Sequence, residues 1–507
     1  MNLANLLANT ARRVPHAPAL LSGNRVLCSY RELAGAVAGR AAALVHDHGV
    51  GPGSRVAVYA SNCPEYLEVL FAIWWAGGTA VPLSAMLHPR EVQALVADCG
   101  AVVLIVSADL ATSFSASLDG AVMVTVDELR PALGRAVRPA TRLTEEAAWI
   151  FYTSGTTGTP KGAVLSNGNL LAMTTAHLAD VEWLDERSGL LHLALMSHAG
   201  GLFALPYVAR GARQVVPEAG STEPAEAWTI LRAQDRVSFF APPVLLRRLV
   251  ACADASSVDA ARMGTVLVGA APVLTSDLTA AVEVFGPRVW NGYGQGETPL
   301  TITALDPRRV AAAIAASDEE ALRSVGFPRI ATQVCVVGGD DVQLPEGEVG
   351  EVVVAGPTVM SGYLDRPEAN AETLRGGWLH TGDLGRFDKG RLTLLDRSKD
   401  LVISGGANIY PREVEDVLMT HPSVGDVAVI GVADPEWGEQ VVAVVVPAAG
   451  RRISAAELDS HCLERMARYK RPKRYHVVDE LPRNGAGKVL KTALRATHTA
   501  TDKEPMT

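Results

Sequence analysis

The chain has 507 residues, more than a single hydrophobic core usually organises, so at least two domains are expected. Hydrophobic residues make up 48% of the sequence and charged residues 20%, a balance that excludes an intrinsically disordered chain. The formal net charge of -9 argues against a protein that coats nucleic acid, whereas small anionic ligands respond to local charges and are not excluded.

The sequence gives no sign of secretion or of membrane insertion. The first residues lack a basic start followed by an apolar core, and no two of the 6 cysteines have Cys-x-x-Cys spacing. We therefore expect reduced thiols in a cytoplasmic protein. The uncharged stretch 69–87 is about long enough to cross a bilayer, but Gly77, Gly78 and Pro82 interrupt it. We predict a buried helix, a glycine turn and a short strand there, and no transmembrane segment.

Strand-like apolar runs alternate with stretches of helical spacing over most of the chain, which predicts an α/β fold with layered, largely parallel sheets. Between about 325 and 396, short β-rich pieces separated by glycine turns predict a smaller β-subdomain. We expect a large N-terminal domain of several subdomains over 1–396 and a hinge at 397–400. A small, mobile α+β C-terminal domain then follows over 401–507.

The segment YTSGTTGTPKGA, residues 152–163, combines hydroxyl side chains and glycines with one lysine, Lys161. Glycines let a backbone fold closely around an anion, so that amides and hydroxyls donate to it together. An apolar, strand-like run precedes the segment, and the lysine position differs from that of the Walker pattern. An ordinary Ser/Gly loop is the alternative, which the density of donors disfavours. The predicted phosphate-binding residues are Thr153, Ser154, Gly155, Thr156, Thr157, Gly158 and Lys161.

This loop resembles the phosphate loop of the adenylate-forming (AMP-binding) superfamily, which includes acyl-CoA synthetases, peptide-synthetase adenylation domains and beetle luciferases. Four further segments resemble that family's motifs in the same order: NGYGQGET (291–298), HTGDLGRF (380–387), DRSKDLVISGGANIYPREVE (396–415) and PRNGAGKVLK (482–491). The pattern is most like that of fatty or aryl acid CoA ligases. It implies that a carboxylate attacks the α-phosphorus of ATP, giving acyl-AMP and pyrophosphate, and that a thiol then expels AMP.

The resemblance assigns the main catalytic role to Lys488, whose ammonium would offset repulsion between the carboxylate and the α-phosphate. Out of this context, a lysine on a glycine turn would be read as an exposed surface residue. We expect Lys491, three residues on, to be a solvated neighbour. Glu297 and Thr153 are the predicted Mg²⁺ contacts, because hard cations prefer oxygen ligands.

The nucleotide site is assigned in the same way. Tyr293 would stack on adenine, Asn291 would bind its amino edge, and Asp383 would accept from the ribose hydroxyls, with Arg397 near the ribose or phosphate. Core packing is the alternative for Tyr293. Further predicted ATP contacts are Gly269, Ala270, Ala271, Gly292, Gly294 and Thr298.

At one position the sequence departs from the family. Gly296 stands where the family often has a Thr or Ser whose hydroxyl reaches the α-phosphate. We expect Thr298 or a backbone amide to compensate, and we expect the glycine to open space in the acyl pocket. His198 would lie near the acyl carboxylate, and no charged residue in these segments would bind an α-amino group. The predicted acyl pocket consists of Met196, His198, Gly200, Gly269, Gly294 and Gly296.

The resemblance implies CoA as the thiol acceptor, because residues 404–407 resemble the loop that admits the pantetheine arm in CoA ligases, and paired glycines let a narrow chain pass close to the backbone. This predicted CoA tunnel consists of Ser404, Gly405, Gly406 and Ala407, and Lys399 is the predicted hinge pivot. The basic run 465–474 would bind CoA phosphates or an acyl carrier protein, or is simply solvated. A carrier-loading enzyme and a catalytically silent nucleotide-binding protein are the alternatives. The acid itself, and whether the chain forms a homodimer, are not readable.

Overall fold

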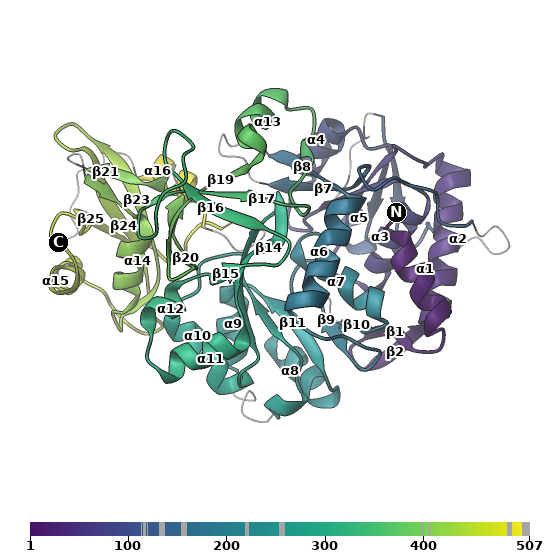
Figure 1. The fold of residues 1–507 in the computed structure, drawn as a ribbon, viewed down its shortest axis with the longest axis horizontal. Helices are drawn as coiled ribbons and strands as arrows, with labels where there is room; N and C mark the ends of the chain where they lie inside the picture. The colour runs from purple at the N-terminus through teal and green to yellow at the C-terminus, as the bar shows by residue number, and fades with distance from the viewer. Residues whose placement is uncertain are drawn as a thin grey trace. The chain divides into compact units, whose positions relative to one another are not determined.

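The computed structural model describes residues 1–112, 114, 118, 120–130, 137–153, 160–218, 223–252, 259–397, 400–404, 407–483 and 489–498. The chain forms two compact units. The first consists of Met1–Val334 with Val353–His380, and the second consists of Cys335–Val352 with Thr381–Thr507. Several sheets with helices between and around them confirm the predicted α/β class (Figure 1).

The largest sheet of the first unit has the strand order β15-β14-β13-β12-β11-β9-β10-β1-β2. Its six strands from β13 to β1 run parallel, and antiparallel pairs close both edges. The strands are β1 (Pro18–Ser22), β2 (Arg25–Ser29), β9 (Gly189–Leu191), β10 (Arg213–Val216), β11 (Val237–Ala241), β12 (Val266–Val268), β13 (Val289–Gln295), β14 (Thr298–Leu305) and β15 (Phe327–Pro328).

The second sheet of this unit has the order β18-β8-β7-β4-β3-β5-β6. Its strands are β3 (Arg55–Tyr59), β4 (Thr79–Leu83), β5 (Val103–Val106), β6 (Val122–Thr125), β7 (Ala147–Thr153), β8 (Lys161–Ser166) and β18 (Gly362–Tyr363). The uncharged stretch 69–87 folds as predicted, with the end of α3 (Pro64–Trp75) followed by the fully buried β4. Among the described residues, no helix is long and apolar enough to cross a membrane.

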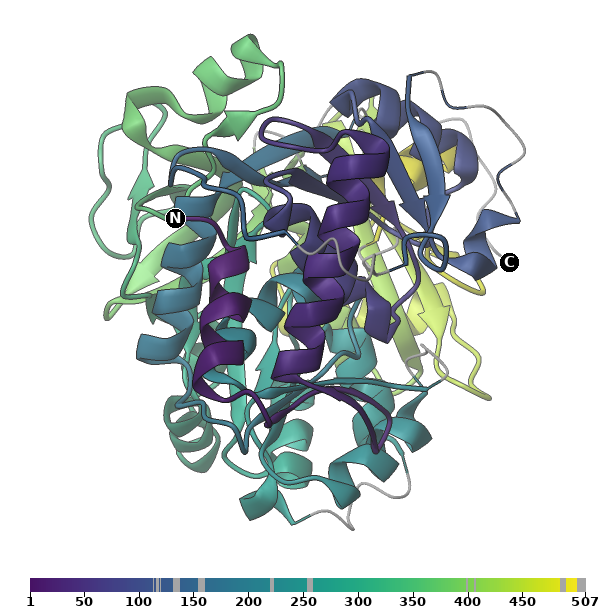
Figure 2. The same cartoon turned by 90° about the vertical axis from the view of Figure 1, so that its right-hand side faces the viewer.

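Helices form a central layer between the two sheets and an outer layer on each. The central helices α3, α6 and α7 are packed between the two sheets, and each of them contacts strands of both. On the outer faces, α8 to α12 cover the nine-stranded sheet and α4 covers the seven-stranded one. Helices α1 and α2 pack side by side (Figure 2). The remaining bounds are α1 (Ala4–Arg13), α2 (Tyr30–His48), α4 (Pro89–Cys99), α5 (Ala108–Ala111), α6 (Asn167–Asp180), α7 (Ala199–Arg210), α8 (Pro224–Ala233), α9 (Pro243–Val250), η2 (Ala260–Arg262), α10 (Thr275–Phe285), α11 (Pro307–Ala315), α12 (Glu319–Arg323), α13 (Pro367–Thr373) and η3 (Arg375–Gly377).

The second unit contains a β-rich part and a C-terminal α+β part. The β-rich part is a four-stranded sheet of order β16-β17-β19-β20, and the C-terminal sheet has the order β22-β21-β24-β23, with β25 on β24. The elements are β16 (Gln333–Val337), β17 (Gly350–Ala355), β19 (Leu379–Asp388), β20 (Arg391–Arg397), β21 (Val402–Ser404), β22 (Ala407–Ile409), α14 (Pro411–Met419), β23 (Val424–Asp434), β24 (Gly438–Pro447), α15 (Ala455–Arg465), β25 (Arg474–Val477) and α16 (Lys491–Thr497).

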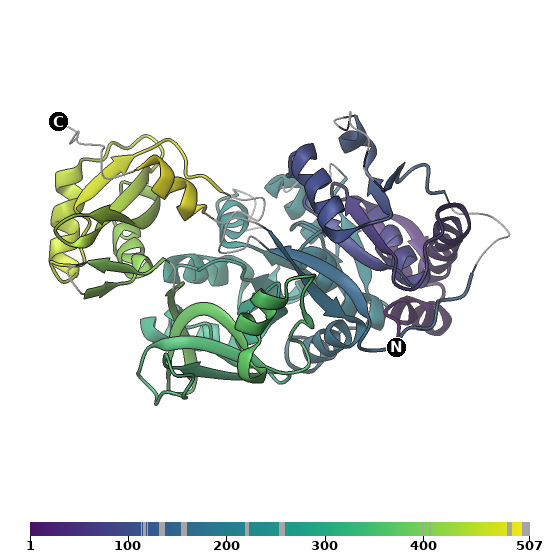
Figure 3. The same cartoon turned by 90° about the horizontal axis from the view of Figure 1, so that it is seen from above.

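Alternating residues of β23 explain why helices lie on both faces of the C-terminal sheet (Figure 3). Val427 and Val429 pack with α14 and α15, whereas Ala428 and Ile430 pack with Leu494 of α16. The structure groups residues 381–397 with this unit, although the sequence assigned residues up to 396 to the N-terminal domain. The hinge position stays a prediction, because Lys399 lies outside the described residues.

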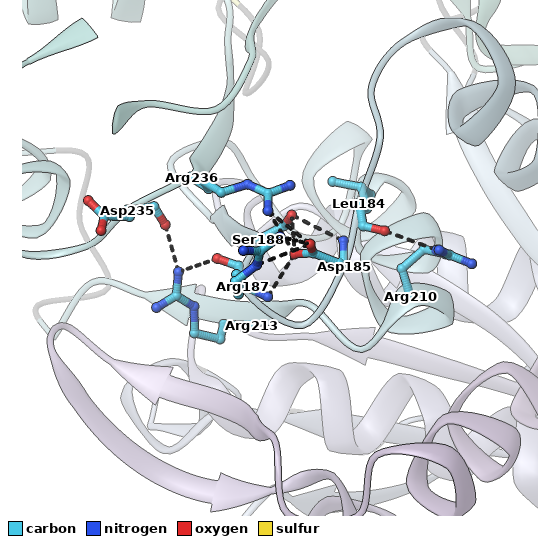
Figure 4. A network of polar contacts seen from close by, with 8 residues as sticks. All are labelled: Leu184, Asp185, Arg187, Ser188, Arg210, Arg213, Asp235 and Arg236. Atoms are coloured by element: carbon cyan, nitrogen blue, oxygen red, sulfur yellow. Dashed lines mark hydrogen bonds and ion pairs between the residues drawn. The ribbon is translucent and has the colours of Figure 1, made fainter. Parts of the chain in front are cut away.

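A network of hydrogen bonds and ion pairs connects the starts of three neighbouring parallel strands, β10, β9 and β11 (Figure 4). The carboxylate of Asp185 accepts from Arg187 Nη2 at 2.8 Å and from Arg236 Nη1 at 2.9 Å. Arg213 Nη2 donates to the carbonyls of Arg187 and Asp235 at 2.8 and 2.7 Å. These contacts therefore fix the edge of the sheet at which these strands begin.

Replacing Asp185 with asparagine is expected to lower the melting temperature by about 2 °C near neutral pH. Partial burial favours the neutral carboxyl, but hydrogen bonds from Arg187 and Arg236 outweigh it and hold the pKa of Asp185 well below its usual range. Because the native pKa is depressed, this stabilisation is present above pH about 4 and is lost as the pH falls further. Thermal unfolding of both proteins between pH 3 and 7 checks the effect. A difference that does not shrink in acid would contradict it.

Candidate active site

The predicted phosphate loop connects two antiparallel strands, β7 and β8, in which Thr153 pairs with Lys161. The strand expected before the loop is therefore present. Gly162 has a packing reason of its own, since a Cβ there would lie 2.7 Å from the Ile150 side chain. Five predicted phosphate contacts lie outside the described residues and stay predictions: Ser154, Gly155, Thr156, Thr157 and Gly158.

The hairpin places one hydroxyl beside Glu297, so the two predicted metal contacts lie next to each other. Thr153 Oγ1 donates to Glu297 Oε1 at 3.0 Å, and Tyr363 Oη donates to the same oxygen at 2.8 Å. Glu297 is only 8% exposed, and Lys161 Nζ lies 5.2 Å from the centre of the Tyr363 ring. Sequence reasoning missed Tyr363. This residue lies in the two-residue strand β18 and is not part of any of the motifs identified in the sequence.

The donor set suits a magnesium ion that also binds ATP phosphates. Both hydroxyls donate to Oε1 of Glu297, and the carboxylate and threonine oxygens are hard ligands. Among the described residues, no group of three or more His, Cys, Asp or Glu could hold a metal ion. Mg²⁺ needs no such group, because one or two carboxylates with substrate phosphates are its usual partners.

Predicted nucleotide-binding residues gather where β12 and β13 end, at the carboxyl edge of the nine-stranded sheet. A Cβ at Gly269 would lie 2.7 Å from the carbonyl oxygen of Gly292, so the two backbones approach closely. Ala270 adopts φ +69°, a left-handed conformation that costs a non-glycine residue energy and is common at functional sites. Asn291 and Tyr293 are 5% and 8% exposed, and Asn291 Nδ2 donates to Ser324 O at 3.4 Å. Two further predicted nucleotide contacts lie in the same segments, Ala271 after β12 and Gly294 in β13.

His198 directly precedes α7, at the start of the helix predicted to line the acyl pocket. Its Nδ1 lies 2.8 Å from Ser197 Oγ, and its ring contacts Phe151 edge-on at 5.4 Å. Burial lowers the pKa of His198 to about 4, so the imidazole is neutral at physiological pH. Met196 is fully buried, and a Cβ at Gly200 would lie 2.7 Å from the carbonyl of Ala194. Gly200 is thus needed for the loop to pack on the helix.

The expected free space at Gly296 is absent, and of the two donors expected to compensate for the missing hydroxyl, Thr298 is excluded and a backbone amide remains. A Cβ at Gly296 would lie 2.7 Å from side-chain atoms of both Phe151 and Thr153, so glycine opens no free space there. Thr298 is fully buried, and its Oγ1 lies 3.1 Å from Thr301 Oγ1 and 3.0 Å from Thr358 Oγ1. Its hydroxyl is committed to this buried cluster, so it cannot replace the missing donor to the α-phosphate.

The revised prediction concerns Gly296→Ala. The added methyl displaces Thr153 from Glu297, so we expect acid-dependent pyrophosphate release to fall about tenfold, with no change in acid preference. Gly35→Ala in α2 is the control, because a Cβ there meets no atom within 4 Å. Altered acid preference at an unchanged rate would restore the acyl-pocket interpretation.

In the second unit, Asp383 and Arg397 face each other as a cross-strand pair of β19 and β20. Arg397 Nε lies 3.1 Å from Asp383 Oδ1, and the Asp383 amide donates to Thr381 Oγ1 at 3.1 Å. Asp383 is 7% exposed. The structure therefore brings these two predicted ribose and phosphate contacts together as a charge-assisted pair.

Residues predicted for the second half-reaction are only partly visible. Ser404 pairs with Ala407 at the end of the β21–β22 hairpin, whereas Gly405 and Gly406 lie outside the described residues. Lys488, predicted for acyl-AMP formation, also lies outside them. The prediction that Lys491 is a solvated neighbour is wrong. Its side chain is 16% exposed, and its Nζ lies 2.8 Å from Glu415 Oε1.

Comparison with known proteins places these observations in one family. The AMP-binding enzyme model matches residues 7–364, and the AMP-binding enzyme C-terminal domain model matches residues 413–488. Feruloyl-CoA synthase from Amycolatopsis sp. is 39% identical over 489 residues, 96% of each chain. ATP-bound MatB from Rhodopseudomonas palustris has a TM-score of 0.88 at 29% identity, covering 99% and 100% of the two chains. Bacillus subtilis o-succinylbenzoate CoA synthetase with its acyl-adenylate OSB-AMP has a TM-score of 0.84 at 29% identity, covering 97% and 98%.

The chain therefore belongs to the AMP-binding enzyme family of adenylate-forming ligases. It is an acid–thiol ligase that uses ATP to convert a carboxylic acid to acyl-AMP and transfers the acyl group to CoA.

Proposed function

We propose that this ligase acts on an aryl-substituted carboxylic acid of the hydroxycinnamate type, with Mg²⁺ and ATP, and makes the CoA thioester. The observation that carries the aryl assignment is the likeness to feruloyl-CoA synthase over nearly the whole of both chains. In this scheme Glu297, with Thr153, contacts the magnesium ion, whose role is to neutralise charge on the ATP phosphates. Asp383 holds the ribose, and Lys488 lies beside the reacting carboxylate.

The described acyl-side residues support an apolar acid. The neutral His198 donates or accepts one hydrogen bond without introducing a charge, and Phe151 supplies an aromatic face beside it. No acidic residue stands in the described stretch 237–243, where an enzyme for amino acids would need one near the α-amino group. A carboxylic acid without an α-amino group is thus better suited to these walls than an amino acid.

The described charges of the C-terminal domain give no support to a carrier protein as an additional acceptor. Within the basic run 465–474, Lys470 Nζ lies 2.6 Å from Glu413 Oε1 and Arg471 Nη1 lies 2.5 Å from Asp459 Oδ1. These two charges are already paired within the domain, so they offer little to an acidic protein surface. CoA needs only a narrow entry for the pantetheine arm and a few cations for its phosphates.

The experiment is a panel of acids with ATP and Mg²⁺, assayed with and without CoA. Ferulic, 4-coumaric, benzoic, octanoic, palmitic and o-succinylbenzoic acids serve as probes, and pyrophosphate, AMP and thioester are measured separately. We expect the highest kcat/KM for the hydroxycinnamates, with thioester formed only when CoA is present. A preference for palmitic acid would overturn the aryl assignment. Acyl-AMP that forms readily but reacts with a phosphopantetheinylated carrier protein and not with CoA would overturn the acceptor.

A further inference from the structure

The chain on both sides of residues 484–488 is paired with itself. Arg483 and Val489 form an antiparallel bridge, and the Leu490 amide donates to the Pro482 carbonyl at 2.8 Å. Because Lys488 directly precedes Val489, the backbone next to the predicted catalytic lysine is held at a fixed place in the second unit.

Lys491 attaches this bridge to helix α14. Its Nζ lies 2.8 Å from Glu415 Oε1, and the same oxygen accepts the Val429 amide of β23 at 2.8 Å. Burial favours the neutral amine, yet Glu415 and Asp396 outweigh it, so the pKa of Lys491 is raised. The ammonium is thus charged at neutral pH, and its partner is itself held by the Val429 amide of the sheet.

Two more ion pairs hold the same region. One turn after Lys491, Arg495 Nη2 lies 2.8 Å from Asp400 Oδ1, and on the other side of the bridge Arg483 pairs with Asp426 of β23. Between the two basic residues of α16, Leu494 is 4% exposed and packs on the sheet. Apolar packing therefore also fastens the helix, so the ion pairs are not its only attachment.

A partly buried ion pair contributes little net stability, because desolvation of both charges offsets their attraction. What such a pair does provide is a defined position, since a single geometry satisfies both partners. We propose that Lys491, through its ion pair with Glu415, is a positioning residue that fixes the segment carrying Lys488 for acyl-AMP formation. The proposal rests on the role assigned to Lys488 under the proposed function.

The test uses the full-length enzyme with Lys491→Met, which keeps the length of the side chain and removes its charge. Acyl-AMP formation is followed by acid-dependent pyrophosphate release, and the second half-reaction by thioester formation from preformed acyl-AMP and CoA. We expect the first rate to fall about tenfold or more and the second to change less than about twofold. The melting temperature is expected to fall by a few degrees, because Glu415 loses its partner charge. Lys389→Met, which removes a 75% exposed lysine from the same unit, is the control.

Glu415→Gln supplies an independent check, because the amide oxygen still accepts the Val429 amide while the ion pair is lost. We expect it to slow the same half-reaction, and we expect the double variant to be no slower than Lys491→Met alone. If the losses in rate of the two single variants add up in the double variant, Lys491 and Glu415 act independently, and the proposed positioning through their ion pair is wrong.

Lys488→Ala, measured in parallel, separates this proposal from the one on which it rests. If Lys488→Ala leaves acyl-AMP formation intact, the catalytic role of Lys488 fails and the positioning role fails with it. If Lys488→Ala stops acyl-AMP formation while Lys491→Met behaves like Lys389→Met, only the positioning role is overturned. Equal loss of both half-reactions in Lys491→Met would also overturn it in favour of a purely structural role.

Discussion

Glu297→Gln is expected to reduce acid-dependent pyrophosphate release by about 100-fold, through the loss of charge at the predicted metal contact. The substitution keeps the shape of the side chain and leaves an oxygen to accept the hydroxyls of Thr153 and Tyr363. The fold around the residue is therefore expected to survive. What disappears is the negative charge that a hard cation requires.

Three measurements make this expectation specific. The Mg²⁺ concentration that gives half-maximal rate is expected to rise, the melting temperature of the ligand-free protein to stay the same, and the affinity for ATP measured without Mg²⁺ to change little. Glu320→Gln, at an exposed position of α12, is the matched control. An unchanged Mg²⁺ dependence together with a slow rate would remove Glu297 from the metal site and leave it a purely structural carboxylate.

Features of the fold that depend on local sequence patterns were predictable from the sequence. The strand before the phosphate loop, the α/β class and the β-rich character of the region after 325 all follow from local patterns of apolar residues and glycines. The cross-strand pairing of Asp383 with Arg397 was not predicted, although both residues were chosen separately. Local pattern identifies a residue type suited to a ligand, whereas register decides which two residues meet.

Tyr363 shows the limit of local pattern most clearly. Its hydroxyl reaches Glu297 because β18 pairs with β8, which places Tyr363 opposite Ala163 in the phosphate-loop hairpin. That contact joins segments far apart in the chain, and a tyrosine after a glycine carries no signal for it. Such a residue becomes visible only when the strand order is known.

The wrong expectations have a common physical cause. Thr298, Gly296 and Lys491 were judged by what their side chains can do, without knowledge of what surrounds them. A hydroxyl next to a catalytic glutamate is as well suited to a buried cluster as to a phosphate. A lysine next to a catalytic lysine is as well suited to an internal carboxylate as to water. Burial and partner choice arise from tertiary packing, which a single sequence does not determine.

Asp383→Asn is expected to weaken ATP binding by about tenfold, because a hydrogen bond to a charged acceptor contributes more than one to a neutral amide. The carboxylate is 7% exposed and lies 3.1 Å from Arg397, so the substitution also leaves the guanidinium without its partner charge. Asp388→Asn, at the other end of β19, is the control, because that strand position pairs with Arg391 and was not assigned to the nucleotide.

The double variant Asp383→Asn with Arg397→Gln distinguishes a direct contact from an effect of the orphaned arginine. If Asp383 holds the ribose itself, ATP binding stays weak when the arginine is also neutralised, and 2′-deoxy-ATP loses less affinity than ATP does on Asp383→Asn. If the double variant regains the affinity of the unmodified enzyme, the loss came from the unpaired guanidinium, and the carboxylate serves the arginine and not the nucleotide. Titration calorimetry with ATP and 2′-deoxy-ATP on the three variants decides between these two roles.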